Sequence, residues 1–394
     1  MKELVKMKKF DCVIVGGGMV GAASALALAQ LGLTVAVIEK SAPATFSSDQ
    51  AFDLRVSAIS LGSQHLLEQL GAWQQLVKWR LCPYHRLGVW EHDFVNTEFL
   101  ADEIAQPYLG HIIENRLIQL SLWQQITVED NITLLCPESL VNFSQNDQEV
   151  IVQLAEQSIG CKILVAADGA NSQVRQLANI GITGWDYQQA CLLVNVETAA
   201  EQQDITWQQF TPTGPMAMLP MPGNHASLVW YHQKDEIKRL SQLPHSALQQ
   251  EILNHFPNRL GDINVIDKAS FPLTRRHANQ YQKGRVLLLG DAAHTINPLA
   301  GQGVNLGFKD VKALQTVIAK AIGDGLSWHD SSVLTQYEKT RRADNLLMMS
   351  TMDALYAGFS HPSPLMKVIR NSGLALANQL PWVKSKALAY ACGI

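Results

Sequence analysis

Three glycines near the start of the chain have the spacing of a phosphate-binding turn. Gly16, Gly18 and Gly21 form a GxGxxG pattern directly after a short β-branched run at residues 10–15. In a strand–turn–helix unit the first glycine permits the turn, the second lets a pyrophosphate approach the backbone, and the third lets helix and strand pack closely. Unpaired N–H groups and the dipole at the helix N-terminus favour the phosphate anion. Glu39, 18 residues after Gly21, is placed to accept hydrogen bonds from ribose hydroxyls. These residues predict dinucleotide binding, with a βαβ unit that holds no ligand as the alternative.

The same stretch carries no charge. Residues 12–38 contain no charged side chain, and about 20 apolar residues suffice to cross a bilayer. The glycines divide this stretch, however, and Gly32 ends its Ala/Leu-rich segment before a second β-branched run. We therefore expect a strand, a tight turn, a helix and a second strand in place of a membrane span.

A second candidate contact begins at Asp168. An apolar run at residues 163–167 leads into Asp168 and Gly169, and Ser172 and Arg175 follow at short offsets. An apolar strand followed by Asp-Gly is usually only a turn. The two polar residues behind this turn favour a second contact with the dinucleotide.

A third polar stretch follows the apolar run at residues 286–289. Asp291, at the end of this predicted strand, can reach a ribityl or ribose hydroxyl, and His294 is a titratable group close by. Gly301, Gln302 and Gly303 open the next predicted helix, where backbone N–H groups attract an anion or a negative charge that develops on a ring. Two glycine-framed helix starts so far apart in the sequence suggest one extended cofactor lying between them.

The elements that must position these residues predict an α/β fold that is α+β overall. Short runs at residues 132–135 and 150–154 are spaced like hairpins, and residues 181–273 contain strand-like runs separated by Pro and Gly, which are typical of an antiparallel sheet. Helices are predicted at residues 304–322, 331–357, 364–377 and 381–391. The expected domains are a discontinuous cofactor domain (1–78, 100–180 and 275–350), an antiparallel-sheet substrate domain (79–99 and 181–274) and C-terminal helices (351–394).

The antiparallel part is rich in aromatic and Met side chains. Such residues could line an apolar pocket, although they are more often plain core. They are Trp207, Phe210, Met216, Met218, Trp230 and Tyr231.

Composition narrows the class of protein. The 394 residues are 47% hydrophobic and 17% charged with a formal net charge of -4, so nothing suggests nucleic-acid binding. The six cysteines are scattered without CxxC pairs, which predicts neither disulfides nor zinc. No apolar segment precedes the first strand, so we expect a cytoplasmic protein. From residue 351 onward the charges are four basic against one acidic, an excess of three. This end therefore either rests on an anionic membrane surface or closes the core or a subunit interface.

Taken in order, the three motifs resemble those of the class A flavin-dependent aromatic hydroxylases, which share the para-hydroxybenzoate hydroxylase fold. The resemblance covers nearly the whole chain. Within that class the chain is similar to the ubiquinone-biosynthesis ring hydroxylases, on residues 55–60 (RVSAIS) and 297–307 (NPLAGQGVNLG). The resemblance implies a Rossmann-like FAD domain that is interleaved with the antiparallel-sheet substrate domain.

The resemblance also implies where FAD would lie. The three glycines would meet its pyrophosphate and Glu39 its adenosine ribose, while Asp168 is tied in this family to both FAD and nicotinamide. Further residues would follow the cofactor toward its ring: Arg55, Arg116 and Gln119 along its length, Asp291 at the ribityl chain, and Pro298, Gly301, Gln302, Gly303, Val304 and Asn305 at the isoalloxazine. Pro298 and His294 are the catalytic candidates, with capping or packing as the alternative for His294.

The activity implied is hydroxylation of the ring of a polyprenylated (demethoxy)benzoquinol, with NAD(P)H and O₂ and through a flavin C4a-hydroperoxide. No second GxGxxG exists for NAD(P)H, as expected in this family. The polyprenyl tail makes association with the inner face of the cell membrane or with a biosynthetic complex reasonable, and a homo-oligomer is compatible with the sequence. The alternatives are a sibling hydroxylase with another ring position or phenol, a flavin-bound assembly component, and a two-electron reductase on the same fold.

Overall fold

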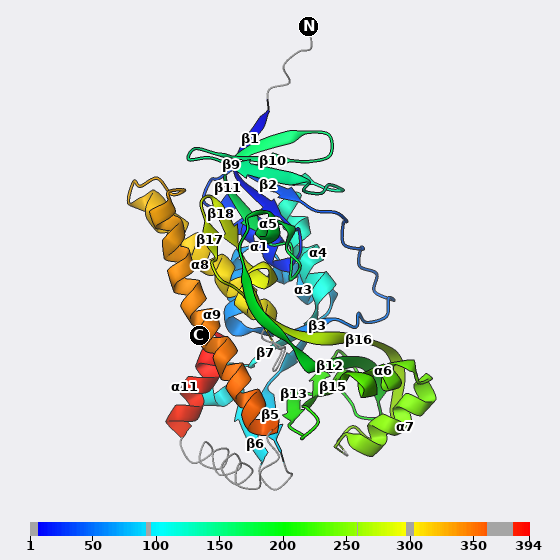
Figure 1. Ribbon diagram of the computed structural model, residues 1–394. Helices are drawn as coiled ribbons and strands as arrows, with labels where there is room; N and C mark the ends of the chain where they lie inside the picture. The colour runs from blue at the N-terminus through cyan, green and yellow to red at the C-terminus, as the bar shows by residue number, and fades with distance from the viewer. Residues whose placement is uncertain (1–6, 92–95, 258, 297–302, 361–380) are drawn as a thin grey trace.

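A computed structural model describes residues 7–91, 96–257, 259–296, 303–360 and 381–394. The described residues form three sheets, and a long two-stranded ribbon connects the upper and lower parts of the molecule in Figure 1.

The first sheet is mostly parallel and has the order β17-β18-β11-β1-β2-β8, with β9 and β10 added as a hairpin beside β11. Its strands are β1 (Lys8–Val15), β2 (Val35–Ile38), β8 (Ile132–Leu135), β9 (Asn142–Gln145), β10 (Val150–Gln153), β11 (Ser158–Ala166), β17 (Gln282–Lys283) and β18 (Val286–Leu288). The hairpin expectation is correct for β9 and β10 but wrong for residues 132–135, which pair in parallel with β2. Helix α4 (Asn115–Ile126) precedes β8 and provides the crossover that parallel pairing requires.

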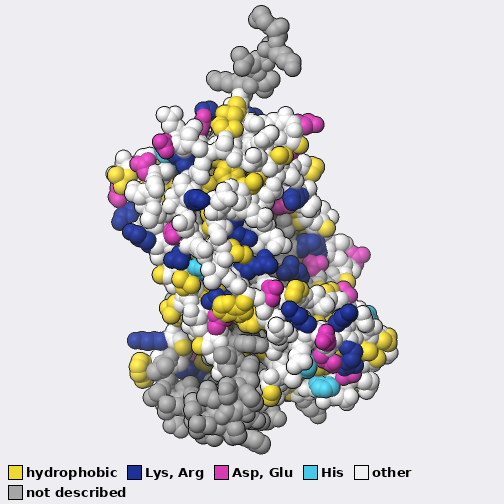
Figure 2. All heavy atoms as spheres, viewed as in Figure 1, with side chains coloured by type: hydrophobic (Ala, Val, Ile, Leu, Met, Phe, Trp, Pro, Cys, Tyr) yellow, Lys and Arg dark blue, Asp and Glu magenta, His cyan; other side chains and the backbone are white. Residues whose placement is uncertain are grey.

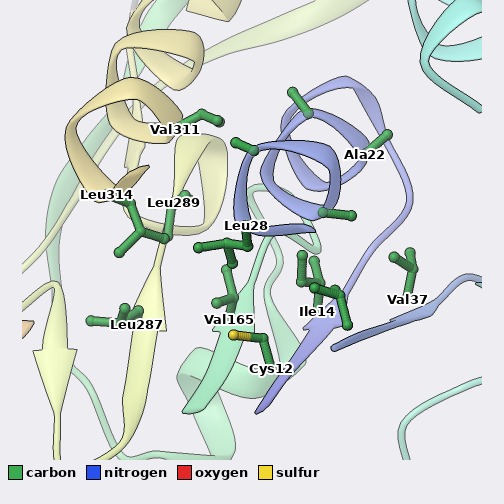
Figure 3. Close-up of a cluster of buried hydrophobic side chains, with 14 of the residues drawn as sticks. Cys12, Ile14, Ala22, Leu28, Val37, Val165, Leu287, Leu289, Val311 and Leu314 are labelled. Atoms are coloured by element: carbon green, nitrogen blue, oxygen red, sulfur yellow. The ribbon is translucent and has the colours of Figure 1, made fainter. Parts of the chain in front are cut away.

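Helix α1 (Met19–Ala29) explains the stretch without charge. It packs on this sheet and contacts both α4 and α8 (Gly303–Gly323), so that every residue from position 21 to position 29 is buried. Figure 3 shows how side chains of β1, α1, β11, β18 and α8 interlock there. With 11 residues the helix is about 16 Å long, too short to span a bilayer. None of the described helices is long and apolar enough to cross a membrane.

The second sheet is antiparallel except for one parallel pair, β13 with β5, and confirms the predicted layer. Its order is β19-β16-β12-β15-β14-β13-β5-β6. Its strands are β5 (Arg86–Trp90), β6 (Asn96–Leu100), β12 (Ile182–Thr198), β13 (Ile205–Gln209), β14 (Met216–Pro220), β15 (His225–Gln233), β16 (Ile263–Ala278) and β19 (His294–Thr295). Strands β12 and β16 form the ribbon that joins the two parts of the molecule (Figure 1).

Helices α6 (Lys234–Gln242) and α7 (His245–His255) cover one face of this sheet. Trp207, Met216, Met218 and Trp230 lie in the core beneath them, so these side chains are core and not pocket lining. Tyr231 belongs to a separate cluster that contains Cys191 and Leu273.

A small third sheet, β3-β7-β4, lies between the two larger sheets (Figure 1). It comprises β3 (Val56–Ser60), β4 (Cys82–Tyr84) and β7 (Gly110–Glu114). The remaining elements are α2 (Leu61–Gln69), α3 (Trp73–Trp79), α5 (Gln173–Leu177), α9 (Ser331–Ser360), α11 (Pro381–Cys392) and two 3-10 turns, η1 (Ala101–Ile104) and η2 (Gly290–Ala292). Helix α9 continues without a break past residue 350, where a domain boundary is predicted.

Candidate active site

The glycine turn has one open position and two closed ones. A Cβ atom on Gly16, whose φ is +99°, would lie 2.4 Å from the Ala167 carbonyl oxygen, and one on Gly21 would lie 1.8 Å from the Gly16 oxygen. A Cβ on Gly18 would have no neighbour within 4 Å. Gly18 precedes helix α1, and no side chain caps the helix N-terminus. The backbone is therefore exposed to a ligand where an anion would be stabilised.

Glu39, directly after β2, and two side chains of α4 hold this turn in place. Glu39 Oε2 accepts a hydrogen bond from the Gly17 N–H at 2.6 Å, and Oε1 accepts from the Lys40 N–H at 2.8 Å. The Gly17 carbonyl accepts from Gln119 Nε2 at 2.9 Å and from Trp123 Nε1 at 2.7 Å. Gln119 thus contacts the turn itself. Trp123 was not predicted from the sequence. Its position four residues after Gln119 places it on the same face of the helix, which could have indicated this contact.

Asp168 meets the first motif and has an unused acceptor. A Cβ on Gly16 would lie 2.9 Å from the Asp168 Cα. Asp168 Oδ2 accepts from the Val174 N–H at 3.2 Å, whereas Oδ1 is buried without a hydrogen-bond partner. A buried acceptor without a donor is unfavourable by roughly 1–3 kcal/mol. This atom therefore fits a site that a ligand donor, or a water that the ligand holds, would complete.

Arg175 joins the second motif to the third. Its guanidinium donates to the Ala292 carbonyl at 2.8 Å and to the Ala170 carbonyl at 2.9 Å. Ser172 caps helix α5 through a hydrogen bond from the Arg175 N–H at 3.0 Å. Arg175 therefore fastens the two loops together, and Ser172 caps α5.

Asp291 lies in the 3-10 turn η2. Its side chain is exposed, yet desolvation by the surrounding protein raises the pKa of its carboxyl, an effect that His294 and the exposed Arg55 oppose. A carboxylate that is exposed but still desolvated is surrounded by protein on several sides. Asp291 and Arg55 are thus close enough to interact, as expected if both face one cofactor.

His294, in contrast, is buried. Its side chain is 2% exposed, and its Nε2 lies 2.6 Å from Asp310 Oδ2. Its ring stacks on that of Tyr281 with a centroid separation of 5.9 Å. These contacts favour packing over catalysis for His294.

Arg116 holds the segment between β2 and β3. Its Nε donates to Asp53 at 2.9 Å, and its Nη1 donates to the Ala44 carbonyl at 2.9 Å. We call residues 41–55 the strap. Arg80 also fastens it, because its guanidinium donates to the Gln50 and Ala51 carbonyls at 3.0 Å. The contacts of Arg116 are thus with the strap.

The start of α8 supplies the last predicted contacts. Gly303 and Val304 form its first residues and are half-buried. The Asn305 side chain accepts from Ser63 Oγ at 2.7 Å and donates to the Ala58 carbonyl at 2.8 Å, so it ties α8 to β3 and α2. The predicted contacts Pro298, Gly301 and Gln302 lie outside the described residues.

Comparison with known proteins identifies the family. Residues 9–350 match the family model described as FAD binding domain. The chain is 47% identical over 386 residues to the Escherichia coli protein named 3-demethoxyubiquinol 3-hydroxylase, covering 98% of both chains. This chain belongs to the FAD-dependent ubiquinone-biosynthesis hydroxylases. The hydroxylase is also 28% identical to human ubiquinone biosynthesis monooxygenase COQ6, mitochondrial, over 97% of this chain and 92% of that protein.

Solved structures agree with the fold of the hydroxylase. The crystal structure of p-nitrophenol 4-monooxygenase PnpA from Pseudomonas putida superposes with a TM-score of 0.79 at 19% identity and covers 97% of each chain. A ternary complex of aklavinone-11 hydroxylase with FAD and aklavinone superposes with a TM-score of 0.70 at 20% identity, over 89% of this chain and 69% of that one. The predicted fold class, an FAD domain joined to an antiparallel-sheet layer, is confirmed.

Proposed function

We propose that this hydroxylase adds a hydroxyl group to the ring of a polyprenylated demethoxybenzoquinol in ubiquinone biosynthesis, with NAD(P)H as electron donor and O₂ as oxygen source. The 47% identity over 98% of both chains to a protein named for this substrate carries the proposal. Residues 207–212, 271–277 and 352–360 add to it, because they resemble the family member that hydroxylates 2-octaprenyl-3-methyl-6-methoxy-1,4-benzoquinol.

The proposed FAD site follows the three motifs. The open backbone at Gly18 receives the pyrophosphate between the closed positions Gly16 and Gly21. Glu39 already accepts from backbone N–H groups, and a carboxylate offers about four lone pairs, so one remains for a ribose hydroxyl. Asp291 receives the ribityl chain.

The remaining cofactor contacts divide into direct and indirect ones. Arg55 lies along the cofactor opposite Asp291, whereas Gln119 and Arg116 act through the glycine turn and the strap. Asp168 Oδ1 completes its hydrogen bonding with FAD or with the nicotinamide donor. Pro298, Gly301 and Gln302, with Gly303, Val304 and Asn305, border the isoalloxazine.

When bound, FAD supplies the redox chemistry: it takes electrons from NAD(P)H, activates O₂ and transfers oxygen to the substrate. The chain's own residues must orient the ring of the quinol and exclude water. Ile296, Leu306, Met348 and Met349 form a buried apolar cluster. Ile296 is the residue that precedes the proposed ring-binding loop in the sequence. A hydroquinone ring is electron-rich, so no strong protein base is demanded, in agreement with the buried position of His294.

We also propose that the hydroxylase is cytoplasmic and associates peripherally with the membrane or with a biosynthetic complex. Support comes from α11, where Trp382 is 65% exposed and Lys386 Nζ lies 5.6 Å from the centre of its ring. Interfacial Trp and basic residues are typical of surfaces that bind anionic lipid. Co-sedimentation with anionic vesicles, compared between the native chain and Trp382→Ala, tests this association.

The proposed activity is tested with purified holoenzyme, demethoxyubiquinol, NAD(P)H and ¹⁸O₂, with the product identified by mass. One labelled oxygen on the ring supports the proposal. A hydroxyl at another ring position, or turnover only with another phenol, identifies a sibling hydroxylase. Oxidation of NAD(P)H with no labelled oxygen in the product identifies a reductase, and a flavin that NAD(P)H never reduces identifies an assembly component.

A further inference from the structure

A fully buried aspartate lies beneath the third motif and has no role in the function so far. Asp310 is on α8, its side chain is 0% exposed, and its carboxylate accepts four hydrogen bonds. Burying a carboxylate is unfavourable by several kcal/mol unless it is paired and hydrogen-bonded. The four hydrogen bonds offset the unfavourable burial of Asp310, so the groups that donate them are held in fixed positions around it.

One carboxylate oxygen holds both ends of a short loop. Asp310 Oδ2 accepts from the Gly290 N–H at 2.9 Å and from His294 Nε2 at 2.6 Å. Gly290 has a φ of +56°, a left-handed conformation that fixes the direction in which the chain continues into Asp291. The residues between the two attachment points are Asp291, Ala292 and Ala293, and only Asp291 carries a polar side chain.

The other carboxylate oxygen is attached to α9. Asp310 Oδ1 accepts from Arg341 Nε at 2.7 Å and from Asn345 Nδ2 at 3.2 Å. Burial alone would raise the pKa of Asp310, but His294 and Arg341 hold it at about 2, so the group stays ionised. The carboxylate is therefore a fixed bridge between two helices and the loop.

We infer that Asp310 is a positioning residue for the cofactor: it does not touch FAD but fixes the loop at residues 290–294 so that Asp291 meets the ribityl chain. The inference rests on the proposed FAD site and adds a residue that acts through Asp291. Arg175 holds the same loop through the Ala292 carbonyl. Asp291 is thus fixed by contacts on both sides of its backbone.

A double-mutant cycle on FAD affinity tests the inference. The dissociation constant of FAD is measured by flavin fluorescence on the full-length, deflavinated chain, in native, Asp310→Asn, Asp291→Ala and doubly substituted forms. We expect Asp310→Asn to weaken FAD binding at least tenfold in the native background but less than threefold in the Asp291→Ala background, because residues that act through one contact are not additive. Equal losses in the two backgrounds would overturn the inference.

Asp344→Asn is the matched control. Asp344 also pairs with Arg341, at 2.5 Å, and accepts a hydrogen bond from the Tyr390 hydroxyl at 3.1 Å, but among the described residues it has no hydrogen bond to the loop. We expect it to change FAD affinity less than threefold; a loss as large as that of Asp310→Asn would mean that the network matters only for general stability, against the inference. If Asp310→Asn does not fold, His294→Leu removes the second attachment of the loop and enters the same cycle with the same expectation.

This experiment is independent of turnover. A chain that binds FAD and shows the expected non-additivity, yet hydroxylates no quinol, would refute the proposed substrate and leave the role of Asp310 standing. A native chain that binds no FAD would overturn both.

Discussion

The glycines of the first motif differ in which atoms an added side chain would contact. Substitutions at them therefore distinguish an effect on stability from an effect on FAD binding. Gly18→Ala adds a methyl group where no atom lies within 4 Å, so we expect the free energy of unfolding of the apoprotein to change by less than about 1 kcal/mol. The same methyl group occupies the space proposed for the pyrophosphate, so FAD affinity should fall at least tenfold. Denaturant unfolding and FAD titration measure the two effects.

Gly21→Ala provides the contrast. Its Cβ would lie 1.8 Å from the Gly16 carbonyl oxygen, a backbone atom that cannot move away cheaply. We expect the apoprotein to lose about 3 kcal/mol or more of unfolding free energy. If Gly18→Ala bound FAD as tightly as the native chain, the proposed approach of the pyrophosphate to this turn would be wrong.

A buried histidine predicts part of the acid sensitivity of the fold. The His111 ring contacts those of Trp73 and Tyr108 edge-on, at centroid distances of 5.0 and 4.3 Å, and burial lowers its pKa to about 4. The unfolded chain, with a pKa of about 6.5, binds the proton more readily, so this contribution to stability is present above about pH 6.5 and is lost as the pH falls toward 4. Between about pH 7 and pH 5 the loss is about 2 kcal/mol.

His111→Phe keeps a ring in this place and removes the titration. Between about pH 7 and pH 5, we expect the unfolding free energy of the variant to fall by about 2 kcal/mol less than that of the native chain. His277, whose pKa burial also lowers to about 4, adds to the sensitivity of both proteins equally. An unchanged pH dependence in His111→Phe would show that this histidine is protonated as easily in the fold as in the unfolded chain.

Among the elements, the strap depends on Arg80, whose ion pair with Glu114 is nearly buried. Arg80 donates to both carboxylate oxygens of Glu114, at 2.7 and 2.8 Å, and its guanidinium lies 4.1 Å from the centre of the Phe52 ring. Glu114 is 3% exposed, so Arg80→Met leaves a nearly buried carboxylate without its cation. We expect a loss of about 3 kcal/mol of unfolding free energy and faster proteolysis within residues 41–55.

The control for this prediction is a surface ion pair. Lys9 and Glu149 are paired at 2.6 Å but are 64% and 30% exposed, so Lys9→Met should change the unfolding free energy by less than about 1 kcal/mol. Comparable effects of the two substitutions would show that Arg80 contributes no more than a surface charge.

At the scale of the whole molecule, Asp353 fastens α9 to the ribbon that connects the two parts (Figure 1). Its Oδ1 accepts from the Tyr187 hydroxyl of β12 at 2.7 Å, and its Oδ2 lies 2.6 Å from Arg275 Nε of β16. The same helix carries Met348 and Met349, which pack against Ile296. Loosening α9 would therefore admit water at Ile296, which precedes the proposed ring-binding loop in the sequence.

We expect Asp353→Ala to raise the hydrogen peroxide released per NAD(P)H oxidised by roughly twofold or more, because water reaches the reacting flavin. The measurement is a peroxide assay alongside NAD(P)H consumption. Arg239→Ala, on α6 in an exposed pair with Glu236, is the control and should leave this ratio unchanged. An unchanged ratio in Asp353→Ala would show that this attachment does not protect the site.

Basic side chains gather on one face of the molecule. Figure 2 shows Lys and Arg side chains gathered across the middle of the displayed face, at the level of the ribbon in Figure 1. A cluster of basic side chains attracts phosphate-bearing ligands. The net charge of -4 gave no indication of it, because opposite charges elsewhere cancel the sum.

The βαβ unit, the antiparallel layer and the three motifs could each be predicted from local patterns in the sequence. A turn that needs Gly16 with a positive φ, a helix such as α1 that is buried along its length, and alternating strands each leave their signature within a few residues. This is why the family resemblance, which implies FAD, could be drawn from the three motifs before any contact between them was known.

Only the tertiary structure decided which residues hold the motifs together. The parallel pairing of β8 with β2, the contact of Trp123 with Gly17, and the bridge from Asp310 to Gly290 join positions that are distant along the chain. Whether a polar side chain such as Gln119 or Asn305 faces a ligand or another loop depends on how helices pack, which no local spacing records. A charged or polar group that is buried must pair with the groups around it, and folding decides which groups those are.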